Sequence, residues 1–116
     1  MNVWPHELKT AQSLTAIGHN VEFIRKSELD RQRSADAYVD GIRYEFKAPK
    51  SDKIDAVERN LKKASKQSCN VVFDSRRMKK IPDVAILREL ASKSHANKSI
   101  KQLLFVNRRG IVVVIK

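Results

Sequence analysis

Two carboxylates and a lysine, Asp36, Glu45 and Lys47, are spaced so that they can act together on a phosphodiester. Side chains alternate faces along a strand, so Glu45 and Lys47 point to the same side of a strand that contains both. If Asp36 lies opposite Glu45 on a neighbouring strand, their Cβ atoms are roughly 4.5–5.5 Å apart, where like charges destabilise a sheet. A divalent cation relieves this repulsion. Mg²⁺ or Mn²⁺ suits such oxygen ligands, and Zn²⁺ is the alternative.

The opposition of these two carboxylates depends on a hairpin around the Asp-Gly dipeptide at positions 40 and 41. Asp-Gly flanked by alternating apolar residues is typical of a two-residue type I′ turn. The segments 36–39 and 42–47 are therefore predicted to be paired strands. With the turn fixed at these two residues, the register places Asp36 opposite Glu45, and Lys47 can hold a water or a phosphate oxygen on the same face.

The remaining elements are predicted from apolar spacing and from turn residues. Trp4-Pro5, followed by apolar residues at helical spacing, indicates a helix that ends near Gly18. Further strands are expected at 21–24, 70–74, 102–106 and 111–115, and further helices at about 52–66 and after Pro82, the last with its apolar face on Val84, Leu87, Leu90 and Ala91. This order, αβββαβαββ, predicts an α/β (α+β) fold in which helices flank a mixed central sheet, and a length of 116 residues fits one domain, 1–116.

Charge is the other strong signal in the sequence. The chain has 24 Lys and Arg against 13 Asp and Glu, and residues 59–116 hold 15 basic and only 3 acidic side chains. Such a half is suited to a polyanion, most often nucleic acid, which it would hold through phosphates without reading sequence. The candidate phosphate-binding residues are Arg31, Arg33, Lys50, Arg76 and Arg77. No run of apolar residues is long enough for a membrane span, and a single cysteine excludes an internal disulfide.

An aspartate followed by Glu-x-Lys on the next strand is the pattern of the PD-(D/E)XK nuclease superfamily, although position 35 is Ala where the superfamily name has Pro. Over nearly its whole length the chain resembles the C-terminal toxin domains of contact-dependent growth inhibition proteins, in particular the tRNA nucleases among them. The segments that carry this resemblance are His6-Glu7, Gly18-His19-Asn20-Val21, the run 35–41, the run 44–50, and Gln67 ahead of Asn70-Val71-Val72.

The resemblance implies a PD-(D/E)XK-like fold and a metal site made by Glu7, Asp36 and Glu45, with Lys47 as a further catalytic residue. Gln67 corresponds to a polar residue on the helix after the Glu-x-Lys strand. Helical spacing independently places Glu7 on the stripe that should face the sheet. The resemblance also implies delivery as the C-terminal part of a larger secreted or cell-surface protein, action in the cytoplasm of a target bacterium, and an acidic immunity protein as partner. Without that origin the domain would be cytoplasmic.

Two other functions are consistent with the same residues. A DNA endonuclease of the restriction or resolvase type would use the same site, because DNA and RNA present the same phosphates, and the preference for tRNA rests on the resemblance. A non-catalytic nucleic-acid-binding module would instead pair Asp36 and Glu45 with Arg43 or Lys47. Dependence on a divalent metal separates a nuclease of this kind from a binding module.

Overall fold

The computed structural model describes residues 4–24 and 36–116. Within them the elements follow the predicted order αβββαβαββ, and every expected helix and strand is present. Their bounds are α1 Pro5–Ala16, β1 Val21–Phe23, β2 Asp36–Val39, β3 Ile42–Lys47, α2 Asp55–Ser65, β4 Asn70–Asp74, α3 Asp83–Ala96, β5 Gln102–Val106 and β6 Val112–Val114. The predicted mixed α/β fold is thus confirmed.

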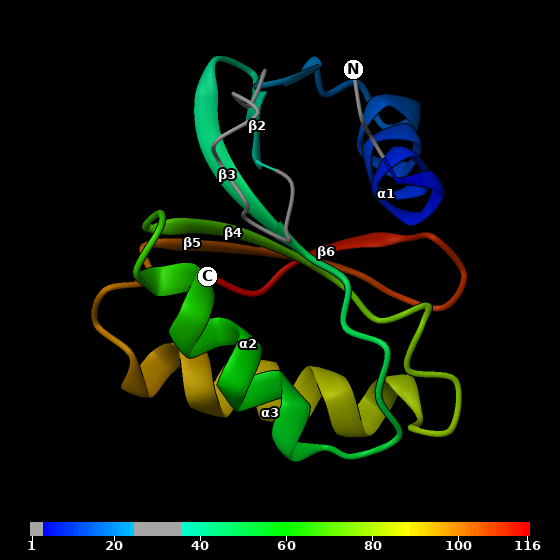
Figure 1. Cartoon of the computed structure of the whole chain (residues 1–116), viewed down its shortest axis with the longest axis vertical. Coiled ribbons are helices and arrows are strands. Elements are labelled where there is room, and N and C mark those ends of the chain that lie inside the picture. Colours follow the sequence, from blue (N-terminus) through cyan, green and yellow to red (C-terminus); the bar gives the residue numbers. More distant parts are fainter. Residues whose placement is uncertain (1–3, 25–35) are drawn as a thin grey trace.

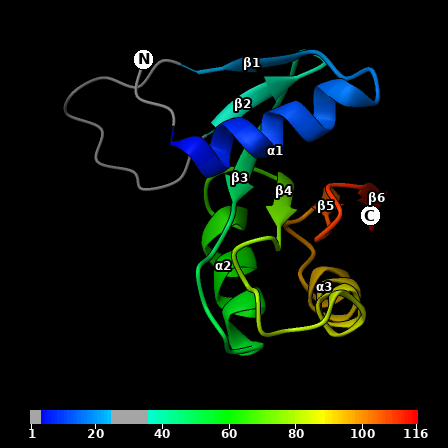
Figure 2. The same cartoon turned by 90° about the vertical axis from the view of Figure 1, so that its right-hand side faces the viewer.

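The strands form one sheet in the order β1-β2-β3-β4-β5-β6. The pairs β3–β4 and β4–β5 are parallel, and the outer pairs are antiparallel. Each parallel connection needs a crossover, which α2 and α3 provide, and these helices lie together on one side of the sheet while α1 lies on the other (Figures 1 and 2). The β2–β3 hairpin twists out of the direction of β4 and β5 (Figure 1).

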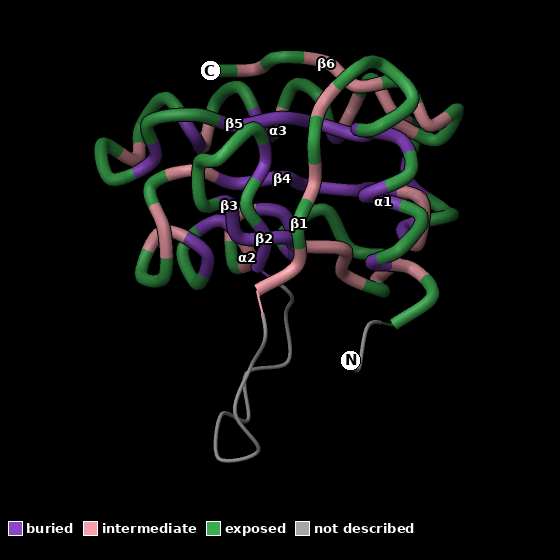
Figure 3. The backbone as a smooth tube through the Cα atoms, turned by 90° about the horizontal axis from the view of Figure 1, so that it is seen from above, coloured by how far each residue is buried: buried purple, intermediate pink, exposed green. Residues whose placement is uncertain are grey.

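Two apolar cores therefore lie on opposite faces of the sheet. On the α2 and α3 side, the buried side chains include those of Leu61, Phe73, Leu90 and Phe105. On the α1 side, Leu14 packs with residues of the hairpin and of the central strands, including Phe46 and Val72. Figure 3 shows that burial is concentrated along β4 and β5, between the two layers. No helix in the described part of the chain is long and apolar enough to cross a bilayer.

The expected apolar face of α3 was wrong in part. Val84 is 60% exposed and Leu87 is 37% exposed, whereas Ile86 and Leu90 are fully buried. The buried positions 86, 90 and 94 recur every four residues, and the small Ser94 continues the stripe against the sheet. The buried face therefore runs through Ile86, Leu90 and Ser94, and Ala91, which was expected on it, is exposed. The helix is rotated relative to the expected face, which left out both Ile86 and the buried serine.

Candidate active site

The hairpin has the register that the sequence predicted. Asp36 lies opposite Glu45, and the turn residues Asp40 and Gly41 have φ values of 53° and 81°, as a type I′ turn requires. Both opposed carboxylates are buried, since Asp36 is 5% exposed and Glu45 is fully enclosed. Two carboxylates thus face each other across neighbouring strands in the protein interior.

The face on which they lie follows from the pairing of β3 with β4. Glu45 is level with Val71, and Lys47 is level with Phe73. Val71 and Phe73 belong to the core beneath α2 and α3, so Glu45 and Lys47 point to that layer. Lys47 is the last residue of β3 and only half-buried, which places its ammonium group where the sheet ends.

Asp36 also has an intramolecular cation beside it. Arg43, on the same face of the hairpin, donates from Nε and Nη2 to Asp36 Oδ2 at 3.1 and 2.7 Å. The side chain of Arg43 is 45% exposed, so this ion pair lies at the edge of the buried site. The contact is one that the binding-module alternative predicted, and it leaves Glu45 as the more deeply enclosed of the two carboxylates.

Glu7 reaches the same region from the opposite layer. It lies in the first turn of α1, which begins at Pro5, and its Oε1 accepts a hydrogen bond from the backbone N–H of Trp4 at 2.9 Å. Glu7 is only 6% exposed, as its position on the inward stripe predicted. One of its oxygens therefore caps the helix, and its negative charge lies at the positive end of the helix dipole.

A cavity of about 650 Å³ collects three of the predicted catalytic residues from three different elements. Glu7 comes from α1, Lys47 from the end of β3, and Gln67 from the turn that follows α2. Asp36 and Glu45 do not line this cavity. They lie on the hairpin behind it, with Glu45 two residues before Lys47. The structure thus brings Glu7, Lys47 and Gln67 around one space and places the opposed pair next to it.

The cavity is basic. Of the predicted phosphate-binding residues, Lys50 and Arg77 line it, and Arg77 Nη1 donates to the backbone carbonyl of Ala48 at 3.0 Å. This bond ties the guanidinium to the segment just after Lys47. Arg76 lies elsewhere, beside Asp74. The remaining two candidates, Arg31 and Arg33, fall outside the described residues.

Sequence reasoning missed several residues that line the cavity, namely His6, Thr10, Asn60, Lys63 and Lys66. Three of these lie on α2 or directly after it. A signal for them was available, because Asn60 and Lys63 are three residues apart and flank the buried stripe of Val57, Leu61 and Ala64. Because the apolar stripe of α2 faces the core, the polar residues beside that stripe lie at the edge of the buried surface, where the cavity opens.

His6 is shifted toward its neutral form. Burial lowers the pKa of this imidazole below its ordinary value, and the positive charge of Arg77 lowers it further, against weaker opposing effects of Glu7 and Asp74. The ring is therefore uncharged near neutral pH and has one nitrogen able to accept a hydrogen bond. This places a neutral group among the cations of the cavity.

The oxygen ligands available in this region suit a hard divalent ion such as Mg²⁺. Mg²⁺ is usually held through one or two carboxylates, with waters and substrate phosphates completing its shell, and the Asp36–Glu45 pair offers that chemistry. Among residues 4–24 and 36–116, no group of three or more His, Cys, Asp or Glu side chains is arranged to hold a metal. The opposed carboxylates of Asp36 and Glu45 are thus the candidate ligands, although Asp36 Oδ2 already accepts hydrogen bonds from Arg43, and Glu7 as a third ligand stays a prediction.

Comparison with known proteins adds two findings. The family model described as "Contact-dependent growth inhibition CdiA C-terminal domain" matches residues 33–112. A solved structure, the CdiA-CT/CdiI toxin and immunity complex from Burkholderia pseudomallei, superposes with a TM-score of 0.71 at 16% sequence identity, over 100% of this chain and 94% of that one. At this identity the superposition bears on the fold. No curated protein matches the sequence.

Proposed function

The chain belongs to the CdiA C-terminal domain family of contact-dependent growth inhibition, a family of toxins, and from that premise we propose that it is a metal-dependent nuclease acting on RNA, with tRNA as the preferred substrate. Such a domain is the C-terminal part of a larger delivered protein that acts in target cells. The property left to propose for this chain is therefore the activity by which the toxin acts on the target cell.

The observation that carries the proposal is the position of Lys47. It lies at the rim of a basic cavity, and on the same strand face two residues away Glu45 is buried opposite Asp36. An ammonium group, a pair of buried carboxylates and a ring of phosphate-binding cations are the parts that phosphodiester hydrolysis needs. The cations of the ring are Lys50, Lys63, Lys66 and Arg77.

The protein's own groups have separable tasks in this account. Lys47 donates to a non-bridging oxygen of the scissile phosphate and offsets the charge that develops there. Arg77, held by Ala48, and Lys50 bind the adjoining phosphates, while the amide of Gln67 orients the substrate from the other side of the cavity. Asp36 and Glu45, with Glu7 as the further predicted ligand, would hold a divalent ion, which would supply Lewis acidity and a water of lowered pKa.

The test is incubation of the purified domain with total tRNA, total rRNA and plasmid DNA, each with Mg²⁺ and with EDTA. We expect cleavage of tRNA in Mg²⁺, none in EDTA, and none by Lys47→Met in either. Lys101→Met, which removes an exposed lysine outside the cavity, is the matched control and should cut like the wild type.

Each other outcome has a definite meaning. Equal cleavage in EDTA contradicts metal dependence. Cleavage of plasmid DNA in preference to both RNAs identifies a DNA endonuclease with the same site. Activity in Lys47→Met equal to that of the wild type removes Lys47 from the mechanism and with it the proposed site.

The ion pair between Arg43 and Asp36 supports a second candidate, a nucleic-acid-binding module without catalysis. In that case Asp36 positions Arg43 rather than a metal. The module would cut nothing in the incubation above, and it would bind RNA with the same affinity in Mg²⁺ and in EDTA.

We further propose an acidic immunity protein as the cognate partner. The similar solved structure is a complex of a toxin with its immunity protein, and the present chain carries a net charge of +11. A partner with a negative surface would associate rapidly with such a domain and could cover its cavity.

A further inference from the structure

A second cavity, of about 770 Å³, adjoins the first on the α1 side of the sheet. It is bounded by α1, by the loop after β4 and by the turn between β5 and β6. His6, Ala48 and Arg77 line both cavities, so the two spaces meet at these residues. Five cationic side chains line the second cavity: Lys9, Arg76, Arg77, Lys79 and Arg109.

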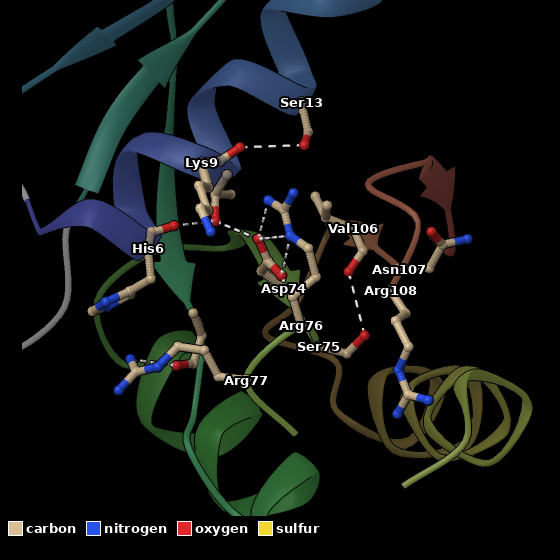
Figure 4. A network of polar contacts seen from close by, with 12 residues as sticks. His6, Lys9, Ser13, Asp74, Ser75, Arg76, Arg77, Val106, Asn107 and Arg108 are labelled. Carbon is tan, nitrogen blue, oxygen red and sulfur yellow. Dashed lines mark hydrogen bonds and ion pairs between the residues drawn. The ribbon is translucent and has the colours of Figure 1, made fainter. Parts of the chain in front are cut away.

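Arg76 is held rigidly in this cavity by a buried acid. Its Nε and Nη2 donate to the carboxylate of Asp74, the shortest of these bonds being 2.7 Å, and its backbone N–H donates to the same group at 3.0 Å. Asp74 is 3% exposed, and Thr10 Oγ1 on α1 donates to it at 2.6 Å. Figure 4 shows the guanidinium of Arg76 held against Asp74 beneath α1. The hydrogen bonds to Asp74 thus orient the guanidinium of Arg76 within the cavity.

The turn between β5 and β6 closes over that guanidinium. Gly110 has a φ of +76°, and a Cβ at this position would lie 3.3 Å from Arg76 Nη1 and 3.4 Å from Ser13 Oγ. A residue with a side chain would be strained there and would crowd the arginine. Glycine allows the close approach and places its neighbour Arg109 at the rim of the cavity.

The charges in the cavity are unbalanced. Asp74 is the single carboxylate among the described residues that line it, and that group is already paired with Arg76. Lys9, Lys79 and Arg109 are exposed, and Arg77 is shared with the first cavity. Cations crowded into one concave space repel each other, and an anion with several charges relieves that repulsion.

We propose that this second cavity binds the backbone phosphates that flank the scissile one, so that a single polynucleotide strand runs from the first cavity across Arg77 into the second. The inference rests on the proposed function, because it takes the first cavity as the place of cleavage. It adds a fixed path for the substrate and a requirement for substrate length. A short oligonucleotide can occupy the first cavity alone, whereas a longer one also contacts Lys9 and Arg109.

The test measures binding rather than cleavage, in a Lys47→Met background. Fluorescence anisotropy gives the Kd for labelled single-stranded RNA and DNA of one sequence, each in a short and a long form, of about 4 and about 16 nucleotides. The variant Lys9→Gln/Arg109→Gln removes two exposed cations of the cavity. Arg88→Gln/Lys101→Gln removes two exposed cations that line neither cavity, and is the control for net charge.

We expect the cavity variant to bind the long strands about tenfold more weakly at low salt, and its slope of log Kd against log salt to fall by about 1.4, for two lost phosphate contacts. The control variant should stay within about twofold of the parent. Short strands should bind all three proteins equally. Both RNA and DNA should show the effect, because the contacts are to phosphates.

Three results would overturn the inference: equal losses in the two variants, no loss in the cavity variant, or no binding of any strand. A loss of immunity-protein binding in place of strand binding would assign the cavity to that partner instead. Failure of the nuclease proposal is seen separately. If the wild type cuts nothing, but Lys9→Gln/Arg109→Gln still binds long strands more weakly than the control variant does, the proposed phosphate path is supported and the proposed nuclease activity is wrong.

Discussion

The molecule contains two buried carboxylate sites that are built differently. Asp74 accepts hydrogen bonds from Thr10 and from Arg76, and these donors neutralise it within the fold. Asp36 also accepts hydrogen bonds from Arg43, but in the sheet it lies directly opposite Glu45, a placement that costs stability for like charges. Burial alone therefore does not mark catalysis. The informative difference is the second acid that the hairpin register places opposite Glu45.

The largest expected effect concerns Glu45. Replacement by Gln keeps the shape and removes the charge, so we expect RNA cleavage in Mg²⁺ to fall by about 10²–10³-fold, the usual effect of losing one group that stabilises the transition state. Glu22→Gln, on the exposed edge strand β1, is the control and should leave the rate unchanged. Single-turnover cleavage rates measure both. Activity in Glu45→Gln within a few-fold of wild type would make Glu45 a structural residue.

The opposite behaviour is expected at Asp74. Asp74→Ala removes the partner of Arg76 and of Thr10 Oγ1, and breaking a buried ion pair in this way should lower the free energy of unfolding by about 3 kcal/mol. Thr10→Val leaves the ion pair and should cost about 1 kcal/mol. Urea denaturation gives both values. If Asp74→Ala is as stable as the wild type, the account of a satisfied structural acid is wrong.

The rate of association with the cognate immunity protein should depend more strongly on salt concentration than on the substitution of any single residue. Because the charge excess of the chain is spread over residues 59–116, raising NaCl from low to high concentration should slow association by about tenfold or more, with a smaller change in dissociation. Stopped-flow fluorescence separates the two rates. An association rate that does not depend on salt would argue against an acidic partner.

The smallest expected effect on stability is at Asp40, an exposed acid that contrasts with the buried acids above. Hydrogen bonds from the Asn20 backbone N–H and from His19 lower the pKa of Asp40 below its ordinary value of 3.8. A lowered pKa in the folded state means that the group stabilises the fold above the unfolded pKa and that this stabilisation is lost as pH falls through the folded pKa. Thermal melts of Asp40→Asn should therefore depend less on pH between about pH 5 and 2 than those of the wild type. Parallel curves for the two proteins would refute the shift.

Features that depend on residues close together in the sequence were predictable, whereas contacts between residues far apart in the sequence were not. The hairpin and the opposition of Asp36 and Glu45 were predictable, because a two-residue turn sets the register locally. The hydrogen bonds that hold Arg76 and Thr10 to Asp74 could not be predicted. Thr10 and Asp74 are 64 positions apart, and only the packing of α1 on the sheet brings them together. The inward face of α3 was misassigned because two apolar stripes compete on that helix, and the buried one contains Ile86 and Ser94 instead of Val84 and Leu87.

The cavity residues illustrate the same limit. Lys47 was predicted from its place beside Glu45 on one strand face, Glu7 from the resemblance and from helical spacing, and Gln67 from the resemblance. The structure places all three around one cavity, which the spacing within α1 and α2 alone could not show. Asn60 and Lys63 could have been predicted from their position beside the buried stripe of α2. The second cavity required the β5–β6 turn to be placed against α1, which is a property of the whole sheet.

The central claim is that Asp36 and Glu45 oppose each other in order to bind a cation, and thermal melting of the wild type and Glu45→Gln in EDTA and in Mg²⁺ tests it most directly. Removing one of two repelling carboxylates should leave the midpoint in EDTA unchanged or higher, and Mg²⁺ should raise the midpoint of the wild type alone, since a ligand of the native state stabilises it by about 2.7 kcal/mol at a hundred times its Kd. A Glu45→Gln protein that melts well below the wild type in EDTA, or that gains as much from Mg²⁺, would contradict the claim.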